Sequence, residues 1–370
     1  MSSAKNERWV VKLGSAQLTD ENGRLSQERI AHWAKNLSEM CRDKIEIVLV
    51  SSGAVAAGVG KLDWDEPPTA LHQLQAAAAV GQMALIQTWQ NEFSQQKIDN
   101  AQILLTHADL SDRSRYLNAK STLVTLIEQK IVPIINENDT VATEEIRVGD
   151  NDTLAAMVSN LIEADLLVII TDQDGLYESD PRSNPDARFI RQADSTDPSL
   201  LKYAGEAASA SSRGGMRTKV EAAKIAAFSG TDTLIVNGQQ TNVLQDIAAG
   251  KMPGTLLEAP QQSLAARKQW IASQLEPQGQ LTLDDGAVEI IRNQNKSLLA
   301  VGVLQVSGKF KRGDLVNCTD QQGNVIASGL CNYSSEECTA LTGKASSEIE
   351  ATLGYVNESA LIHKDNLIIL

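Results

Sequence analysis

Acidic and amide side chains are concentrated in one short stretch, INENDTVATEEIRVGDND, which spans residues 135–152 and follows the apolar residues IVPI. Between Asn136 and Asp152 it holds six carboxylates and a single base, Arg147. An aspartate that caps a helix starting near residue 151 explains one of these acids. The rest of the cluster requires cations, and a substrate ammonium, lysine side chains or Mg²⁺ would meet that need.

Basic residues that match this acidic stretch lie in two other motifs. Lys12 stands late in the apolar run WVVKLGS, just before a glycine turn, and Arg217 and Lys219 follow Gly214-Gly215 at the start of a predicted helix. Cations at a helix N-terminus oppose the macrodipole by about 0.3–1 kcal/mol each, so the motif GGMRTK indicates a bound anion. The ordinary alternatives are a solvated helix start and, for Lys12, a side chain that extends from a strand end into water.

Two further motifs place hydrogen-bonding groups directly after apolar runs. VSSGAVAAG, residues 50–58, is typical of a strand, a turn that contains Ser52, and a helix whose first N–H groups can hold an anion. A plain serine cap is the alternative. TDQDGLYESDPR begins with Thr171-Asp172 at a predicted strand tip, where both residues are suited to bonding a nucleotide. The sequence has no P-loop, because it lacks a GxxxxGK[ST] motif.

These motifs together indicate phosphoryl transfer, which depends mainly on positioning and on neutralising charge. Two lysines, a glycine-rich anion loop and an acidic substrate cradle supply those functions. A carboxylate acceptor is already ionised at pH 7 and needs no general base. That explains why no histidine or cysteine nucleophile accompanies the cluster.

The elements that must position these side chains form an α/β pattern. Short aliphatic runs at 9–15, 45–53, 101–106, 131–139, 166–175 and 233–238 are apolar on both faces, which predicts buried parallel strands. Helical spacing lies between them, for example over 26–41 after a possible Ser26 cap. Ligands of such sheets bind beyond the carboxyl ends of the strands, where the acidic stretch is expected.

The pattern changes near residues 255–277, where Pro277 precedes Gly279 in a predicted linker. Short strand-like runs with turn residues follow and predict a small, mostly β domain over 278–358. A chain of 370 residues also favours two domains. We therefore expect a first domain over 1–260, a linker over 261–277, the β domain and a tail over 359–370.

Composition excludes several classes of function. The net charge of −14 and pI near 4.8 disfavour whole-chain attraction to nucleic acid or anionic membranes. Four scattered cysteines and four histidines match no zinc motif. The first residues, MSSAKNERWVVKLG, show no signal-peptide pattern, and no run approaches a spanning helix of about 20 apolar residues. We expect a cytoplasmic protein with reduced thiols.

The motifs VVKLGS, VSSGAVAAG, INEND, VGDND, TDQDGLYESDPR and GGMRTK, in this order, resemble the amino-acid kinase family over essentially the whole chain. The pair INEND and VGDND resembles the branch that phosphorylates glutamate. The resemblance implies a three-layer αβα sandwich around a mostly parallel sheet, followed by a PUA-like domain. It also implies ATP-dependent phosphorylation of the γ-carboxylate of L-glutamate, the first step of proline biosynthesis, with Mg²⁺ on the nucleotide.

The resemblance assigns roles to the residues of these motifs. Lys12 and Lys219 would neutralise the transferred phosphoryl group, and Asp152 would hold the two lysines. The remaining residues would bind the two substrates: glutamate at Ser52, Asn136, Asp139, Asp150 and Asn151, and ATP at Thr171, Asp172, Arg213, Gly214, Gly215, Met216, Arg217 and Thr218, together with Lys12 and Lys219. No metal ligand is assigned to the protein.

The resemblance also implies partners: a homo-oligomer (dimer or tetramer), proline as feedback inhibitor, and hand-over of the labile product to glutamyl phosphate reductase. Two alternatives stay open. One is a related kinase with a different carboxylate or carbamate acceptor. The other is an RNA-binding protein that acts through the PUA-like domain. Residues 278–358 hold six basic and ten acidic residues, so nucleic acid is the less favoured partner.

Overall fold

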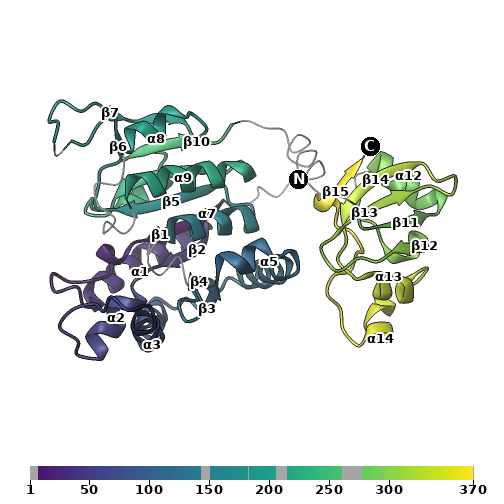
Figure 1. The fold of residues 1–370 in the computed structure, drawn as a ribbon, viewed down its shortest axis with the longest axis horizontal. Coiled ribbons are helices and arrows are strands. Elements are labelled where there is room, and N and C mark those ends of the chain that lie inside the picture. The colour runs from purple at the N-terminus through teal and green to yellow at the C-terminus, as the bar shows by residue number, and fades with distance from the viewer. Residues whose placement is uncertain are drawn as a thin grey trace. The chain divides into compact units, whose positions relative to one another are not determined.

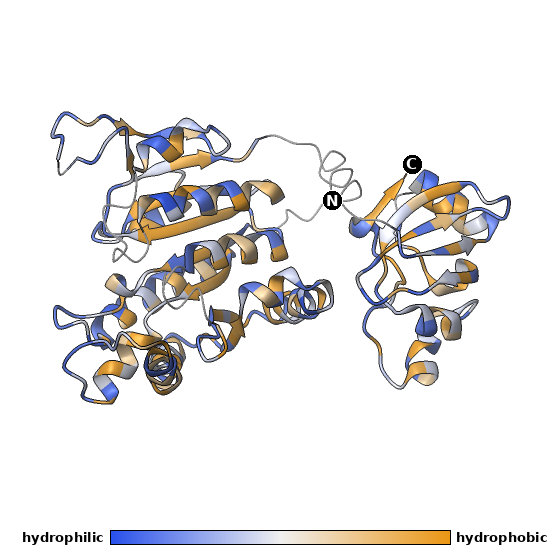
Figure 2. Cartoon of the chain, in the orientation of Figure 1, coloured by the Kyte–Doolittle hydropathy of each residue, from blue (hydrophilic) through white to orange (hydrophobic). Residues whose placement is uncertain are grey.

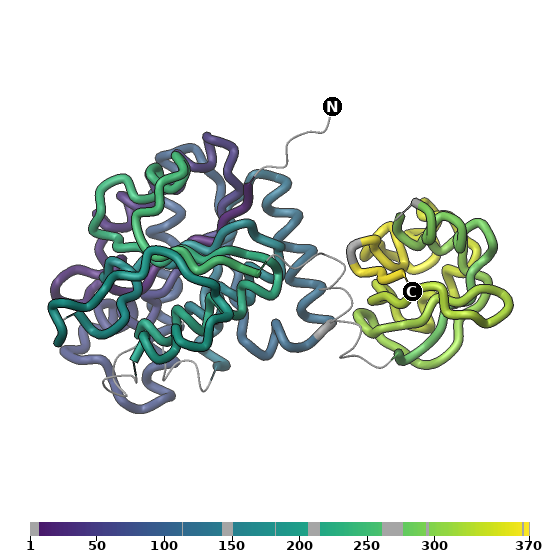
Figure 3. The backbone as a smooth tube through the Cα atoms, turned by 90° about the horizontal axis from the view of Figure 1, so that it is seen from above, coloured from purple at the N-terminus to yellow at the C-terminus, as the bar shows by residue number. Residues whose placement is uncertain are grey.

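The computed structural model describes residues 7–142, 151–181, 183–205, 215–260, 277–294 and 296–369. The chain forms two compact units. Unit 1 comprises Met1–Ser111 and Ala119–Gln261, and unit 2 comprises Asp112–Asn118 and Gln262–Leu370. Each unit has its own strands and its own buried core. The path of the chain can be followed by residue number along the coloured tube in Figure 3.

Unit 1 is built on a sheet with strand order β3-β4-β2-β1-β5-β9-β10-β8. Its strands are β1 (Arg8–Leu13), β2 (Glu46–Ser51), β3 (Asn100–Leu105), β4 (Val132–Glu137), β5 (Leu166–Thr171), β8 (Gln192–Asp194), β9 (Asp232–Asn237) and β10 (Thr255–Glu258). The pairs from β3 to β9 are parallel, and β10 runs antiparallel to β9. Six strands match the predicted runs; the short strands β10 and β8, which form the end of the sheet beyond β9, were not predicted.

Helices cover both faces of this sheet, so the predicted three-layer αβα arrangement is confirmed (Figure 1). One face packs against α1 (Gln27–Arg42), α3 (Leu71–Gln95) and α10 (Val243–Ala248). The other packs against α7 (Asn151–Ile162) and α9 (Met216–Ala226). Strand β5 (LLVIIT) is apolar at every position but the last, whereas the helices alternate between hydrophobic and hydrophilic residues (Figure 2).

The local sequence accounts for these elements. The Ser26 hydroxyl accepts the Arg29 N–H at 3.3 Å and caps α1 as predicted, while Ile30, Trp33 and Leu37 are buried on its inner face. Further elements of unit 1 are η1 (Ser15–Gln17), α2 (Ala54–Lys61), α4 (His107–Ser111), β6 (Leu176–Tyr177), β7 (Phe189–Ile190), α8 (Ser199–Tyr203) and η2 (Ala227–Ser229); α5 spans Arg113–Glu128. Within the described ranges, no helix has the length and apolarity that crossing a membrane requires.

The order of the strands places a binding crevice beside β1. The chain builds β2, β4 and β3 on one side of β1, then returns to add β5 and β9 on the other side. Loops that leave β1 and its two neighbours therefore diverge at the carboxyl edge of the sheet. Such a switch in strand order is where open α/β sheets bind ligands.

Unit 2 is a five-stranded sheet of order β12-β11-β13-β14-β15. Its elements are β11 (Gly279–Leu283), α12 (Asp285–Gln294), η3 (Ala300–Gly302), β12 (Val303–Gly308), β13 (Leu315–Thr319), β14 (Val325–Leu330), α13 (Ser335–Leu341), η4 (Ser346–Glu348), α14 (Ile349–Leu353), η5 (Lys364–Asn366) and β15 (Leu367–Ile369). The predicted β-rich second domain is confirmed. β15 pairs antiparallel with β14, so the last residues of the chain complete this sheet.

Candidate active site

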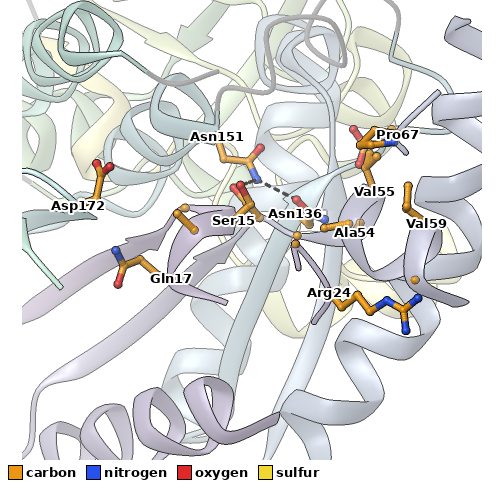
Figure 4. Close-up of a pocket in the computed structure, with 18 of the residues that line it drawn as sticks. Ser15, Gln17, Arg24, Ala54, Val55, Val59, Pro67, Asn136, Asn151 and Asp172 are labelled. Carbon is orange, nitrogen blue, oxygen red and sulfur yellow. Dashed lines mark hydrogen bonds between the residues drawn. The ribbon is translucent and has the colours of Figure 1, made fainter. Parts of the chain in front are cut away.

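A cavity of about 810 Å³ opens at the carboxyl edge of the unit 1 sheet. Strands β1, β2, β4 and β5 end at it, and α7 and α9 begin beside it (Figure 4). Eight of the residues predicted from the sequence line it: Lys12, Ser52, Asn136, Asp139, Asn151, Thr171, Asp172 and Lys219. Tertiary structure thus brings together side chains that lie more than 200 positions apart in the chain.

Asp152 joins the two predicted lysines at the floor of this site. Its Oδ1 lies 2.5 Å from Lys12 Nζ and its Oδ2 lies 2.8 Å from Lys219 Nζ. The side chains of the lysines are 6% and 5% exposed, and that of Asp152 is fully buried. Burial alone would raise the pKa of Asp152, but the charges of Lys12 and Lys219 and their hydrogen bonds hold the pKa below its ordinary value. One ionised carboxylate therefore keeps two ammonium groups side by side.

This arrangement leaves a net positive charge at the end of the cavity. Lys12 reaches the site from β1, and Lys219 from the first turn of α9. Thr218 Oγ1 lies 3.0 Å from Asp152 Oδ2 and 2.8 Å from the Gly215 carbonyl oxygen, which ties the start of α9 to the same carboxylate. Two buried ammonium groups held by one carboxylate are suited to binding a multiply charged anion such as a phosphoryl group.

Amides and a hydroxyl surround the next part of the cavity. The Asn151 Nδ2 group lies 2.9 Å from Asn136 Oδ1, 3.1 Å from Ser52 Oγ and 3.2 Å from the Ser51 carbonyl oxygen, and the first of these bonds is drawn in Figure 4. Gly53, with φ of 106°, makes the left-handed turn that lets α2 begin directly after Ser52. The ends of β2 and β4 and the start of α7 are thereby joined into one polar surface.

Asp139 lies on the same wall of the cavity, after the end of β4. Desolvation by burial raises the pKa of its carboxyl from 3.8 to about 6. A half-buried carboxylate with so high a pKa is stabilised by an incoming cation, because the cation replaces the lost hydration. Asp139 is therefore suited to binding an ammonium group.

Thr171 and Asp172 define a second side of the site at the end of β5. The Thr171 hydroxyl donates to Asp172 Oδ1 at 3.2 Å, and the Thr171 carbonyl accepts from Gln17 Nε2 at 3.1 Å. A second cavity of about 650 Å³ adjoins this side and shares Ala16, Gln17 and Asp172 with the first. The site therefore extends past β5, away from Asn136 and its neighbours.

The other predicted residues are not among the described residues that line the cavity. Asp150, Arg213 and Gly214 lie outside the described residues. The Arg217 side chain is exposed and its Nε donates to Glu221 Oε1 at 3.0 Å on the surface of α9. Gly215 forms the cap of α9, and Met216 opens that helix without lining either cavity.

Other residues of the site were not predicted from the sequence. Gln17, Arg24 and Trp64 line the first cavity, although none belongs to the motifs considered above. Gln82 also takes part, because its Oε1 accepts from Asn136 Nδ2 at 2.7 Å. A signal for Gln82 was present: it is one of the few polar residues in an alanine-rich helical run, QLQAAAAVGQMALIQTW.

Comparison with known proteins agrees with this geometry. The family model described as the amino acid kinase family matches residues 7–237, and a PUA domain model matches residues 279–353. The chain is 53% identical over 363 residues to a protein named glutamate 5-kinase from Pseudomonas paraeruginosa, and 54% identical over 363 residues to one of the same name from Stutzerimonas stutzeri; each match covers 98% of both chains.

Among solved structures, the UMP kinase from Bacillus anthracis matches with a TM-score of 0.50 at 14% identity, over 68% of this chain and 96% of that one, which concerns the fold alone. The matched family model covers strands β1 to β9, the two lysines and the aspartate of the site, and the relatives extend over nearly the whole length. The chain belongs to the amino acid kinase family and carries a C-terminal PUA domain.

Proposed function

We propose that the protein transfers the γ-phosphoryl group of ATP to the γ-carboxylate of L-glutamate, which yields ADP and γ-glutamyl phosphate and begins proline biosynthesis. The observation that carries this proposal is the buried bridge of Lys12, Asp152 and Lys219 beside a surface of amides and carboxylates. The names of relatives that are 53% identical over 98% of the chain support the same reaction.

The reaction requires positioning rather than proton transfer. A γ-carboxylate oxygen attacks the γ-phosphorus, the bond from that phosphorus to the bridging oxygen of the β-phosphate breaks, and ADP leaves with the bonding electrons. Lys12 and Lys219 neutralise the negative charge of the group in transit, which lowers the barrier, and their own burial strengthens this effect. Asp152 keeps the two ammonium groups in place, since without its charge they would repel each other.

Glutamate binds between the lysines and the polar wall. Asp139 pairs with the α-ammonium group, because it is an acid whose raised pKa reflects lost hydration. Ser52, Asn136 and Asn151, joined by hydrogen bonds, hold the carboxylates, and Asp150 completes this set in our proposal. An acceptor without the ammonium would leave Asp139 unpaired.

ATP binds at the side of Thr171 and Asp172, with the segment from Arg213 to Lys219 around its phosphates. Mg²⁺ belongs to the nucleotide in this proposal and supplies neutralisation of phosphate charge when bound. The residues fit an ion carried in this way, because both Asp152 oxygens bond to lysines and are unsuited to a metal. Within the described residues, no group of three acidic, histidine or cysteine side chains is arranged to hold a metal ion.

We further propose a cytoplasmic enzyme, where both substrates occur, that works as a dimer or tetramer. Exposed apolar side chains on unit 1 support self-association: Met83 is 76% exposed and Val141 is 65% exposed. Proline shares its α-carboxylate and its amine with glutamate, so we propose that it inhibits by occupying the glutamate site. An acyl phosphate hydrolyses readily, and we propose that a reductase receives it from this enzyme.

The experiment that tests this function supplies ATP and Mg²⁺ with a panel of acids and traps any acyl phosphate with hydroxylamine. We expect hydroxamate with L-glutamate, and little with N-acetylglutamate, which lacks the ammonium group that Asp139 would pair with. Omitting ATP is the control for non-enzymatic reaction. Equal rates with both acids would refute the proposed acceptor, and hydroxamate with neither would refute the reaction.

A further inference from the structure

One face of α3 contacts three separate segments of the acceptor side of the site. Gln75, Gln82 and Trp89 are spaced by seven residues, so they lie almost above one another along the helix. Gln75 Nε2 donates to the Ala142 carbonyl at 3.1 Å, and Gln82 Oε1 accepts from Asn136 Nδ2 at 2.7 Å. Trp89 Nε1 donates to Ser51 Oγ at 3.1 Å.

Each of these bonds reaches a segment that carries a site residue. Ser51 ends β2 and precedes Ser52, Asn136 belongs to the end of β4, and Ala142 follows Asp139 by three positions. The segments come from regions of the chain about 85 residues apart, and α3 is the element that bonds to all of them through side chains. These three side chains are separate from the lysine bridge and from the nucleotide side of the site.

The Glu137 backbone N–H, which can only donate, fixes which way the Asn136 amide points, and Gln82 accepts from the amide nitrogen on the other side. The Asn136 nitrogen donates to Gln82, and its oxygen is directed to the Asn151 amide at 2.9 Å and to the Glu137 N–H at 2.9 Å. A reversed amide would set the nitrogens of Asn136 and Asn151 against each other, donor to donor. By accepting from the Asn136 nitrogen, Gln82 therefore stabilises the orientation in which Asn151 can bond to both Asn136 and Ser52.

The backbone of α3 is held rigidly enough to act in this way. A Cβ atom on Gly58 of α2 would lie 1.8 Å from the Ala77 carbonyl oxygen, and one on Gly81 of α3 would lie 1.9 Å from the Ala54 carbonyl oxygen. The two helices thus touch backbone to backbone, which only glycine permits. Because α2 begins directly after Ser52, the helix that carries the glutamines is locked to the loop that carries this hydroxyl.

We propose that α3 holds the three segments of the acceptor site in position, and that Gln82 is a positioning residue that sets glutamate affinity through Asn136. Trp89 and Gln75 hold the flanking segments at Ser51 and Ala142. The inference rests on the proposed glutamate kinase function and deepens it. Because the nucleotide side at Thr171 receives none of these bonds, the effect falls on glutamate and leaves ATP binding unchanged.

The test compares Gln82→Leu with Gln82→Glu, and uses Gln87→Leu on the exposed face of the same helix as the matched control. Leucine removes the acceptor for Asn136, whereas glutamate retains an oxygen that can accept. We expect the KM for glutamate to rise about tenfold in Gln82→Leu, in line with leaving one buried amide unpaired. We expect changes of less than about threefold in Gln82→Glu and in the KM for ATP of every variant.

A double-mutant cycle shows whether Gln82 acts through Asn136. Gln82→Leu added to Asn136→Ala should change the KM for glutamate less than about twofold, because the bond is already absent. Trp89→Phe is a second variant that keeps the stacking on Phe93, at 5.7 Å between ring centroids, and removes only the donor to Ser51. We expect it to raise the KM for glutamate about threefold or more.

Equal rises in both KM values, additive effects in the cycle, or no change in either Gln82→Leu or Trp89→Phe would overturn the inference. Thermal unfolding of each variant, measured alongside, identifies a general loss of folding. If Gln82→Leu does not fold, the KM of Trp89→Phe for glutamate serves as the test instead. A wild-type protein that makes no hydroxamate from glutamate refutes the proposed function itself. A wild type active on glutamate with unaffected variants refutes only the role of α3.

Discussion

Replacing Asp139 by asparagine should make the free protein more stable while weakening its function. The carboxyl of Asp139 has its pKa raised from 3.8 to about 6 by burial. A folded-state pKa above the unfolded value means that ionisation disfavours the folded state. The stability contribution of the protonated acid is complete below pH 3.8 and is lost as the pH rises through 6. Asparagine has a similar shape and never ionises.

The size of the effect follows from these values. The difference between the two pKa values corresponds to about 3 kcal/mol. Water reaches part of this carboxyl, so we expect roughly half of that, about 1.5 kcal/mol, as the gain in unfolding free energy at pH 7.5. For a unit of this size such a gain raises Tm by about 3–6 °C.

The assay is thermal unfolding of wild type and Asp139→Asn at several pH values, each with and without L-glutamate. The variant should be more stable at pH 7.5, and its advantage should disappear as the pH falls from 6 towards 4. Glutamate at about 100 times its Kd should stabilise the wild type by about 2.7 kcal/mol and the variant far less. Wild-type kcat/KM for glutamate should also fall below pH 6, since the protonated acid cannot pair with an ammonium group.

A variant that is less stable than wild type at pH 7.5, or a gain in stability that does not depend on pH, would refute this reasoning. Either result would show that the ionised Asp139 carboxylate does not lower the free energy of unfolding. Equal stabilisation of both proteins by glutamate would contradict its pairing with the substrate ammonium. The carboxyl would then have a role in the architecture of the loop after β4.

Four other outcomes are expected. Asp152→Asn leaves two buried ammonium groups without their counter-ion, so unfolding free energy should fall by about 3–5 kcal/mol; an unchanged Tm would contradict the buried bridge. Lys219→Ala should lower kcat about 10²–10³-fold with a smaller change in the KM for glutamate, and a loss confined to KM would make Lys219 a binding residue only. Gly81→Ala should destabilise by about 1–3 kcal/mol because its Cβ meets the backbone of α2; a neutral change in Tm would contradict that close contact. A chain ended at residue 275 should still phosphorylate glutamate, since the site lies in unit 1, and a folded but inactive product would refute the independence of the units.

Local signals in the sequence were sufficient for the main elements. The strands β1, β2, β4 and β5 are aliphatic on both faces because they are covered on both sides, so periodicity and length identified them. The start of helix α1 could be predicted from Ser26, which caps it. The short strands β8 and β10 gave no comparable signal, because strands of three and four residues are stabilised by pairing with their neighbours rather than by their own pattern.

The chemistry of the site was also visible in residue types. Lys12 stands late in an apolar run and Lys219 at a helix N-terminus, where a positive charge is costly, and Asp152 belongs to an acidic cluster larger than one helix cap requires. Their partners were decided only by tertiary structure. That Asp152 bonds to both lysines depends on β1, α7 and α9 meeting at one edge, across 67 and 140 positions of the chain. Arg217 lies only two positions before Lys219, yet it points away from the site and pairs with Glu221. Residues two apart in a helix point to different faces, whereas residues four apart share a face. The sequence shows Gln82 only as a polar residue in an alanine-rich helical run; that it bonds to Asn136, 54 positions away, was decided by the packing of α3 in the fold.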